Sequence, residues 1–239
     1  MRGPATPKQK RAVGIVQALF GVVLISPVLF LAAAFGTKFG IWGWRFGYLM
    51  TIEAAWWAAL VGVVAALAAV AAAFIDVRRA GPFALAAVVV SAVTIALFIR
   101  HFGLMRAVAP DPDATTNLAD PPGFSSRILA RREGDGAVAV NRWAGGRDGC
   151  QTEGSIPMQI APGSAIWALE QAGFDVVGAG VGSADGTREG FWFGFTHDAT
   201  IRIRPGQTDV RVVAREDRPD GGEACRLTRR IAEAVQTGR

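Results

Sequence analysis

Hydrophobic positions dominate the first hundred residues of this chain, in three long stretches with almost no charge. They cover residues 12–35, 54–75 and 82–99. At a helical rise of 1.5 Å per residue, each reaches across a hydrocarbon core of roughly 30 Å, the last one only just. The pattern therefore predicts three transmembrane helices in a membrane domain of residues 1–106.

Beyond residue 106 the pattern changes to short periodic segments separated by turns, as in a water-soluble domain. A linker with scattered proline and polar residues covers residues 107–120, and the domain covers 121–239. Ser164 and Gly173 frame a predicted helix at 165–172. The strands predicted after it are 174–181, 188–196, 198–204 and 208–215, with a turn at 182–186 and with Phe191, Phe193 and Phe195 on one face of the second strand.

The clearest helical periodicity lies near the C-terminus, behind Asp220 and Glu223 at the spacing of a capping box. The residues on its apolar side are Ala224, Leu227, Ile231, Ala234 and Val235. The order of helix, four strands and helix predicts an α+β fold, in which helices pack on a four-stranded antiparallel sheet. Three N-terminal transmembrane helices precede this soluble domain.

The last two predicted strands, joined at residues 205–207, define a charged sheet face. We expect a register that places Arg202 opposite Arg211, two like charges that repel unless an anion or another acid lies between them. Because side chains alternate along a strand, one face carries four arginines and two acids: Arg202, Arg204, Arg211, Arg215, Asp198 and Asp209. Arg202, Arg211 and Arg215 are therefore candidate anion-binding residues. The alternative is a solvated outer face with weak ion pairs.

The basic character of the chain belongs to its membrane half. Residues 1–106 contain ten Lys or Arg and two acids, whereas residues 107–239 contain 15 Arg, 18 acids and no Lys. The formal net charge of +5 therefore comes from residues that flank the spans. A nucleic-acid-binding protein concentrates positive charge where it binds, so this distribution argues against a nucleic-acid partner.

Lysine and arginine near the spans also predict an orientation. With the N-terminus in the cytoplasm, the inner flanks carry six of these residues and the outer flanks carry four. The inner ones are Arg2, Lys8, Lys10, Arg11, Arg78 and Arg79, and the outer ones are Lys38, Arg45, Arg100 and Arg106. This bias predicts a bacterial inner-membrane protein with a cytoplasmic N-terminus and a periplasmic C-terminal domain.

Aromatic and small residues fit the same arrangement. The loop at residues 37–47 and the start of the second span are rich in Trp and Phe, as in an aromatic belt at a membrane interface. Ala58, Gly62 and Ala66 recur every four residues in the second span, a spacing that lets helices approach closely.

The candidate chemistry is sparse. The two cysteines, Cys150 and Cys225, both lie in the soluble domain, and outside the cytoplasm such a pair is predicted to form a disulfide. Alternatively, one of them is the nucleophile of a thiol enzyme, with His197 as its base. Cysteine and histidine lack the spacing of a metal site, and no phosphate-binding glycine loop or nucleophile elbow occurs. We therefore expect no metal, no cofactor and no catalytic residue.

Two segments resemble a bacterial membrane-associated family known as domain of unknown function 1499. Residues 115–124, TTNLADPPGF, resemble its opening motif T-x-D-x-x-x-P-P-x-F, and residues 193–203, FGFTHDATIRI, resemble its FGF-x-D-D-x-x-I-R motif. Arg211 and Arg215 fall where the family has R-S-x-S-R, although this chain has Val-Val-Ala between them. His197 replaces one of the paired acids. The resemblance implies a fold and a membrane setting, but no activity.

These features predict a multi-pass inner-membrane protein with an extracytoplasmic domain that is not an enzyme. Its partners would be the lipid bilayer and an envelope protein or anionic ligand. Two alternatives remain open: the thiol-dependent enzyme that uses Cys150 or Cys225 with His197, and a structural subunit of an envelope complex.

Overall fold

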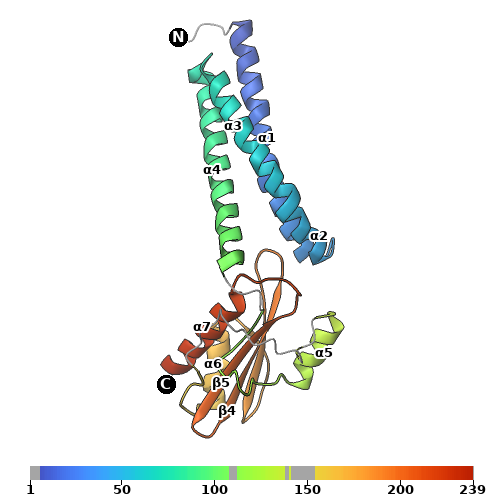
Figure 1. Cartoon of the computed structure of the whole chain (residues 1–239), viewed down its shortest axis with the longest axis vertical. Coiled ribbons are helices and arrows are strands. Elements are labelled where there is room, and N and C mark those ends of the chain that lie inside the picture. Colours follow the sequence, from blue (N-terminus) through green and yellow to red (C-terminus); the bar gives the residue numbers. More distant parts are fainter. Residues whose placement is uncertain (1–5, 108–111, 138–139, 141–153, 239) are drawn as a thin grey trace. The chain divides into compact units, whose positions relative to one another are not determined.

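The chain folds into two compact units, Met1–Phe102 and Gly103–Arg239 (Figure 1). The structure is a computed structural model, and it describes residues 6–107, 112–137, 140 and 154–238.

The first unit is helical. It contains α1 (Pro7–Lys38), α2 (Trp44–Leu49), a π-helical stretch η1 (Met50–Ala55), α3 (Trp56–Ala73) and most of α4 (Val77–Ala107). Three stretches are long and apolar enough to cross a membrane: Pro7–Lys38, Trp44–Ala73 and Val77–Gly103. The three predicted hydrophobic helices are thereby confirmed, and this is a membrane protein with three candidate spans and a globular domain.

Small and hydroxyl-bearing residues hold the spans together. A Cβ on Gly62 would lie 3.5 Å from the Cα of Val23, so α1 and α3 are close at this glycine. The Oγ of Ser91 donates to the carbonyl of Gly62 at 3.3 Å, and Ser26 Oγ donates to the carbonyl of Ala55 at 2.7 Å. The predicted small-residue contact in the second span is therefore present at Gly62. Close packing replaces the hydrophobic effect as the main attraction between helices in lipid.

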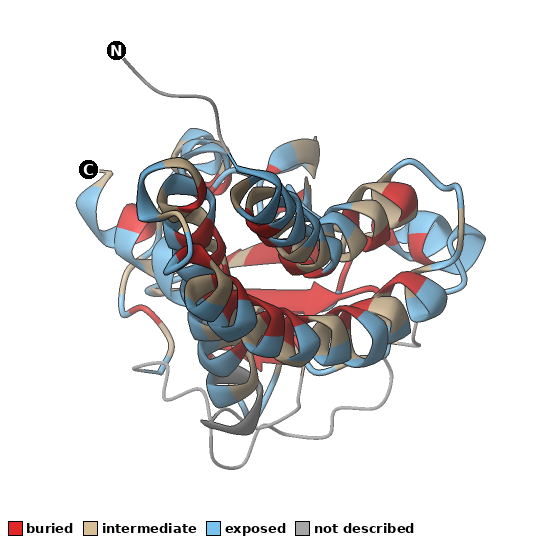
Figure 2. Ribbon diagram, turned by 90° about the horizontal axis from the view of Figure 1, so that it is seen from above, coloured by how far each residue is buried: buried red, intermediate tan, exposed pale blue. Residues whose placement is uncertain are grey.

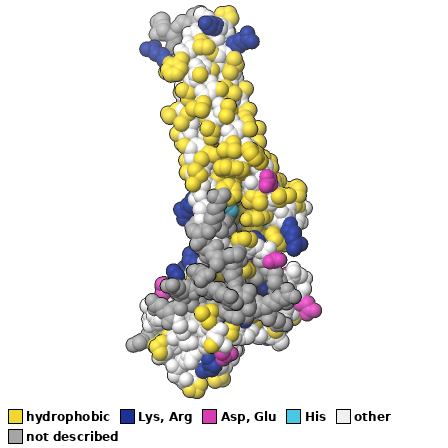
Figure 3. Space-filling model, viewed as in Figure 1, with side chains coloured by type: hydrophobic (Ala, Val, Ile, Leu, Met, Phe, Trp, Pro, Cys, Tyr) yellow, Lys and Arg dark blue, Asp and Glu magenta, His cyan; other side chains and the backbone are white. Residues whose placement is uncertain are grey.

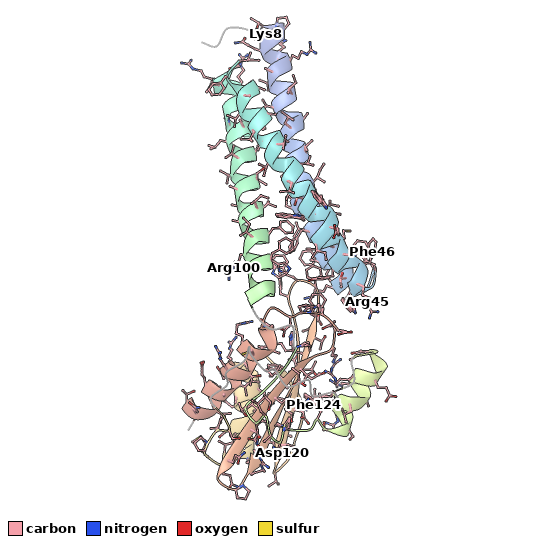
Figure 4. The ribbon with its side chains drawn as sticks, viewed as in Figure 1. Lys8, Arg45, Phe46, Arg100, Asp120 and Phe124 are labelled. Atoms are coloured by element: carbon pink, nitrogen blue, oxygen red, sulfur yellow. The ribbon has the colours of Figure 1, made fainter. Side chains whose placement is uncertain are left out.

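The ends of the helical unit differ from its middle in charge. In Figure 3 the side chains along the helices are mostly hydrophobic, and Lys and Arg lie toward the two ends. Figure 4 places Lys8 at one end of the unit, and Arg45, Phe46 and Arg100 toward the other. Trp42, in the loop between α1 and α2, donates to the carbonyl of Ala33 at 3.4 Å. Charged ends and an apolar middle are what a bilayer requires.

The second unit is built on a five-stranded antiparallel sheet with the order β1-β5-β4-β3-β2. Its strands are β1 (Asp113–Thr115), β2 (Asp175–Ala179), β3 (Ser183–Glu189), β4 (Thr196–Arg204) and β5 (Gln207–Ala214). The predicted α+β class is confirmed, with one strand more than expected. The additional strand, β1, lies in the segment interpreted as a linker, and it pairs with β5 at the edge of the sheet.

The second predicted strand was misplaced. The structure puts β3 at Ser183–Glu189, across the expected turn, and Gly190–Phe195 forms a loop. A Cβ on Gly186 would lie 3.0 Å from the Cβ of Phe174, so this strand uses a glycine where another side chain packs on it. The alternating phenylalanines match a strand period, but their loop sits beyond the paired register, which ends at Glu189 and Thr196.

Helices cover both faces of the sheet. α6 (Pro162–Gln171) and α7 (Glu223–Thr237) lie on one side, and α5 (Ser126–Gly134) lies on the other (Figure 1). α6 starts at Pro162 and not behind Ser164, since proline suits the first helical position. Its predicted end is confirmed at Gly173, with φ at 82°.

The apolar core lies between the sheet and helices α6 and α7. The predicted apolar side of the C-terminal helix is buried there. Figure 2 shows buried residues of the sheet in red. The largest fully buried side chains of this core are Leu169, Ile201, Val210, Val212, Leu227, Ile231 and Val235. The opposite face of the sheet therefore carries the polar side chains.

The register of β4 and β5 differs by two residues from the predicted one. Arg202 is opposite Asp209, and Arg211 is opposite Thr200. The turn consists of Pro205 and Gly206, with Gly206 at φ 70°, and it leaves out Gln207, which pairs with Arg204. A shift of two residues keeps every side chain on its predicted face, but it places Arg202 opposite an acid and separates it from Arg211.

Candidate functional site

The predicted charged face of the sheet is a buried layer of arginine and aspartate. The buried charged residues of this layer are Asp113, Arg132, Asp185, Asp198, Asp209, Arg211 and Arg215. α5 and the segment before it cover the face through an apolar contact of Phe124 and Ile128 with Val213. The expectation of a solvated outer face is therefore wrong for the residues beneath this contact.

Asp198 on β4 is the centre of the layer. Its side chain is fully buried, and its Oδ2 accepts from Arg132 Nη1 at 2.8 Å and from Arg215 Nε at 2.9 Å. Its Oδ1 accepts from Arg215 Nη2 at 2.7 Å and from the hydroxyl of Thr187 at 2.8 Å. Arg215 also pairs with Asp135, which follows α5. One carboxylate thus joins β3, β4, α5 and the end of β5.

A second pair closes the β1 edge. Arg211 on β5 binds Asp113 of β1 with both nitrogens of one side, Nε at 3.0 Å and Nη2 at 2.6 Å. Its third nitrogen, Nη1, donates to the carbonyl of Pro122 at 3.2 Å. The ring of Phe124 lies 5.7 Å from the guanidinium of Arg211 and 6.0 Å from that of Arg132. The arginines therefore gain aromatic as well as ionic contacts.

The hairpin end holds a more accessible cluster. Asp209 accepts from Arg202 Nη2 at 2.9 Å and from Arg204 Nη2 at 2.8 Å, and it also accepts from Ser155 at 2.6 Å. Asp120 bridges the same two arginines from the solvent side, 3.1 Å from Arg202 and 2.9 Å from Arg204. The side chain of Asp120 is 57% exposed. Its position in the second unit, like that of Phe124, can be found in Figure 4.

The arginines keep most of these carboxylates ionised. Burial raises the pKa of Asp198, but the hydrogen bonds and charges of Arg215, Thr187 and Arg132 outweigh burial and hold the pKa below its usual value. Burial also raises the pKa of Asp209, but donors that include Ser155 and Arg202 outweigh burial and lower this pKa to about 2. Asp113 differs, because burial outweighs Arg211 and raises its pKa.

The three predicted anion-binding residues lie on one face, and each already has a carboxylate partner. Arg202 pairs with Asp209 and Asp120, Arg211 with Asp113, and Arg215 with Asp198 and Asp135. Binding of an external anion stays a prediction. The layer also depends on Arg132 and Asp113, which the sequence pattern did not single out. The N-cap at Ser125 could have indicated the helix that carries Arg132.

The residues proposed for thiol chemistry are only partly described. His197 is buried, with its Nε2 3.6 Å from Oδ2 of Asp220. Although burial raises the pKa of Asp220, His197 and the backbone amides of Ala224 and Gly222 lower it below its usual value. Cys150 lies outside the described residues, and no cysteine in the described part of the chain is a free thiol.

No metal centre is evident in the described ranges: they contain no group of three or more His, Cys, Asp and Glu side chains that could hold an ion. Comparison of the chain with protein-family models, curated proteins and solved structures found no match. The resemblance to domain of unknown function 1499 therefore has no support from a family model.

Proposed function

We propose that this chain is a bacterial inner-membrane protein whose periplasmic domain binds an envelope protein or an anionic ligand and does not catalyse a reaction. One observation carries the proposal: three candidate spans lie ahead of a single folded unit in the same chain. An odd number of crossings puts the two ends of the chain in different compartments. The excess of Lys and Arg near the N-terminus and between the second and third spans supports a cytoplasmic N-terminus.

The charge layer supports binding over catalysis. A general acid or base works best with a pKa near the working pH, whereas arginines hold the pKa values of Asp198 and Asp209 well below that range. His197, the base of the alternative thiol mechanism, is buried against Asp220. Asp198, Asp209 and His197 are therefore suited to stabilising the fold of the domain, which positions its binding surface.

Reporter fusions test the orientation. A phosphatase that is active only outside the cytoplasm, fused at the C-terminus of the full chain, should be active. The matched control is the same reporter fused after Arg79, between the second and third spans, and it should be inactive. A cytoplasmic fluorescent reporter should give the reverse pattern. If the phosphatase were active when fused after Arg79 and inactive when fused at the C-terminus, the periplasmic assignment would be overturned.

The anion-binding part of the proposal is strongest at Arg202. Arg211 and Arg215 are almost completely buried, while Arg202 reaches the surface beside the exposed carboxylate of Asp120. A phosphate or carboxylate ligand that displaced Asp120 would meet Arg202 and Arg204 in the same geometry. Paired guanidinium groups suit such an anion because they donate two parallel hydrogen bonds.

Titration of the full chain in detergent with inorganic phosphate tests this site. Asp120→Asn removes the competing charge and should tighten phosphate binding several-fold, and Arg202→Ala should abolish it. Arg226→Ala serves as the control, because Arg226 lies on α7 and pairs with Glu223. If phosphate bound no variant, or bound all of them equally, the proposed anion site would be disproved. The proposed orientation in the membrane would not be affected.

A disulfide between Cys150 and Cys225 belongs to the same proposal, since the periplasm is oxidising. Thiol labelling of the native membrane protein tests it. The labels should react only after reduction, and the Cys150→Ser variant should expose a reactive Cys225. Labelling without reduction would remove the disulfide and favour the thiol enzyme. The other alternative is a structural subunit of an envelope complex. In that case the same partner proteins should co-purify with the chain in every preparation, and no ligand should bind.

A relationship to domain of unknown function 1499 is also proposed, on the two motifs at residues 115–124 and 193–203. Its support is that both motifs meet on one sheet face: Thr115 belongs to β1, Phe124 covers Arg211, and β4 carries Arg202. Residues far apart in the sequence thus form one layer of the domain.

A further inference from the structure

The loop between β3 and β4, Gly190–Phe195, presents two large aromatic side chains to solvent. Phe191 is 67% exposed and Trp192 is 48% exposed, and their rings meet edge to face at 5.1 Å. They are the one pair of sequence neighbours among the exposed large hydrophobics of the described part of the second unit. Single exposed apolar side chains are common on protein surfaces, whereas contiguous ones are a feature of surfaces that contact a partner or a membrane.

The base of this loop is held firmly. The amide of Gly190 donates to the carbonyl of Phe195 at 2.8 Å, which closes the loop. The rings of Phe193 and Phe195 stack at 5.0 Å, and the guanidinium of Arg218 lies 3.4 Å from the centre of the Phe195 ring. The carboxylate of Glu216 accepts from the amide of Thr196 at 3.0 Å. A fixed base presents the tip without a large loss of entropy when it binds.

The loop lies at the end of the sheet where the chain arrives from its last membrane helix. The amide of Ala214 donates to the carbonyl of Pro112, just before β1, and the amide of Arg215 donates to the carbonyl of Thr196, just after the loop, both at 2.9 Å. β1 and β4 both run antiparallel to β5, so they start at the same end of the sheet. The aromatic tip and the incoming chain therefore share one end of the domain.

The covalent connection limits how far that end of the sheet can lie from the end of α4. α4 contains the third candidate span and ends at Ala107, and Pro112 follows five residues later. Even fully extended, five residues reach only about 17 Å. The headgroup layer on each side of the hydrocarbon core is several ångströms thick, and it is where tryptophan and phenylalanine rings prefer to lie.

We propose that Phe191 and Trp192 form an interfacial anchor, which inserts its rings into the headgroup layer of the bilayer that the chain itself spans. The anchor adds a second attachment to the α4 connection and holds the β1 end of the sheet against the lipid surface. The proposal depends on the candidate spans and not on which side of the membrane the domain occupies, so it stands or falls separately from the periplasmic assignment.

Fluorescence of the full chain in vesicles of phosphatidylcholine and phosphatidylglycerol tests the anchor. The difference between the wild type and Trp192→Phe isolates the emission of Trp192 from that of the six other tryptophans. Lipids brominated near the headgroup should quench this emission about twofold and aqueous iodide should not, because an interfacial ring is shielded from water.

A matched control uses the opposite end of the sheet. Val181 is 89% exposed in the turn between β2 and β3. Val181→Trp in the Trp192→Phe background should be quenched by iodide and not by brominated lipid. If Trp192 behaved in the same way, the anchor would be overturned. Trp192 could also be shielded from iodide without being quenched by brominated lipid. If this happened only at high protein density, the ring would be covered by a second copy of the chain, and the anchor would again be overturned.

Discussion

Asp198 shows how this domain accommodates charges that water does not reach. Its carboxylate lies between two arginines and a threonine hydroxyl, so both oxygens accept two hydrogen bonds each. Arg132 and Arg215 both form ion pairs with Asp198, and Arg215 also pairs with Asp135. Buried charges tolerate this environment only when they are paired and hydrogen-bonded.

Loss of the Asp198 charge should therefore destabilise the domain strongly. Asp198→Asn removes the buried carboxylate charge to which Arg132 and Arg215 both donate, and removing one partner of a buried pair costs about 3–5 kcal/mol. Denaturant unfolding of the full chain in detergent measures the change. The control Asp120→Asn removes an exposed partner and should lower the stability by less than about 1 kcal/mol. Equal effects of the two variants would contradict the central role of Asp198.

The lowered pKa of Asp209 predicts a pH effect on stability. The pKa of Asp209 is about 2 in the folded protein and rises to about 3.9 on unfolding. Because the folded value is the lower one, the ionised carboxylate stabilises the fold above pH 4, and this contribution of about 2 kcal/mol disappears as the pH falls through 2.

Unfolding measured from pH 7 to pH 2 checks this prediction. Asp209→Asn should be less stable at pH 7 and should show a weaker decline below pH 4. Some decline remains, since Asp198 and Asp220 also have lowered pKa values, whereas the raised pKa of Asp113 acts in the opposite direction. An unchanged pH profile in Asp209→Asn would show that this carboxylate contributes nothing.

At the scale of elements, α5 and β1 close the charged face of the sheet. β1 is three residues long, and α5 contributes Ile128 and Arg132 to the buried side. The apolar contact of Phe124, Ile128 and Val213 covers the ion pairs from the outside. Water would otherwise reach the guanidinium groups and screen their charge.

Two neighbouring positions on α5 test this cover. Ile128→Ala should cost about 2–4 kcal/mol and should expose α5 to protease, because it leaves a cavity over the ion pairs. Leu129→Ala, at an adjacent position that is exposed, should change the stability by less than about 0.5 kcal/mol. Limited proteolysis and unfolding of the full chain compare the two variants. Similar behaviour would mean that α5 is not held by its buried face.

Local pattern was sufficient for some elements and misleading for others. The C-terminal helix has a complete apolar stripe, and it forms where it was predicted. The run of Phe191, Phe193 and Phe195 has the same regularity at the strand period, but it forms a loop. Periodicity records which side chains are apolar, whereas pairing depends on the neighbouring strand, which ends its register at Thr196.

At the scale of the whole molecule, the membrane unit determines how the chain is inserted. The proposed orientation depends on six basic residues on the inner flanks against four on the outer flanks. Arg78 and Arg79 lie between the second and third spans and supply two of the six. The difference between the two sides is small enough that these two residues decide it.

Removal of that pair should therefore disturb the insertion. Arg78→Gln combined with Arg79→Gln leaves four basic residues on each side and should give a mixture of both orientations. Protease added to one side of sealed membrane vesicles measures the fraction of chains with an accessible C-terminal domain. Arg229→Gln combined with Arg230→Gln, on α7 of the folded domain, is the control and should insert as the wild type does. Uniform insertion of the first variant would remove the charge-bias argument.

The sequence by itself determined the three apolar helices, the α+β class and the sheet face on which each hairpin residue lies. These features follow from composition and from periods of two or 3.6 residues, which are local properties of the chain. Only the tertiary structure decided the partners of the arginines. Asp113 meets Arg211 across 98 positions, and Arg132 meets Asp198 across 66, through elements with no strong pattern of their own. Whether a charged face is solvated or buried depends on what folds over it, and that is a property of the whole domain.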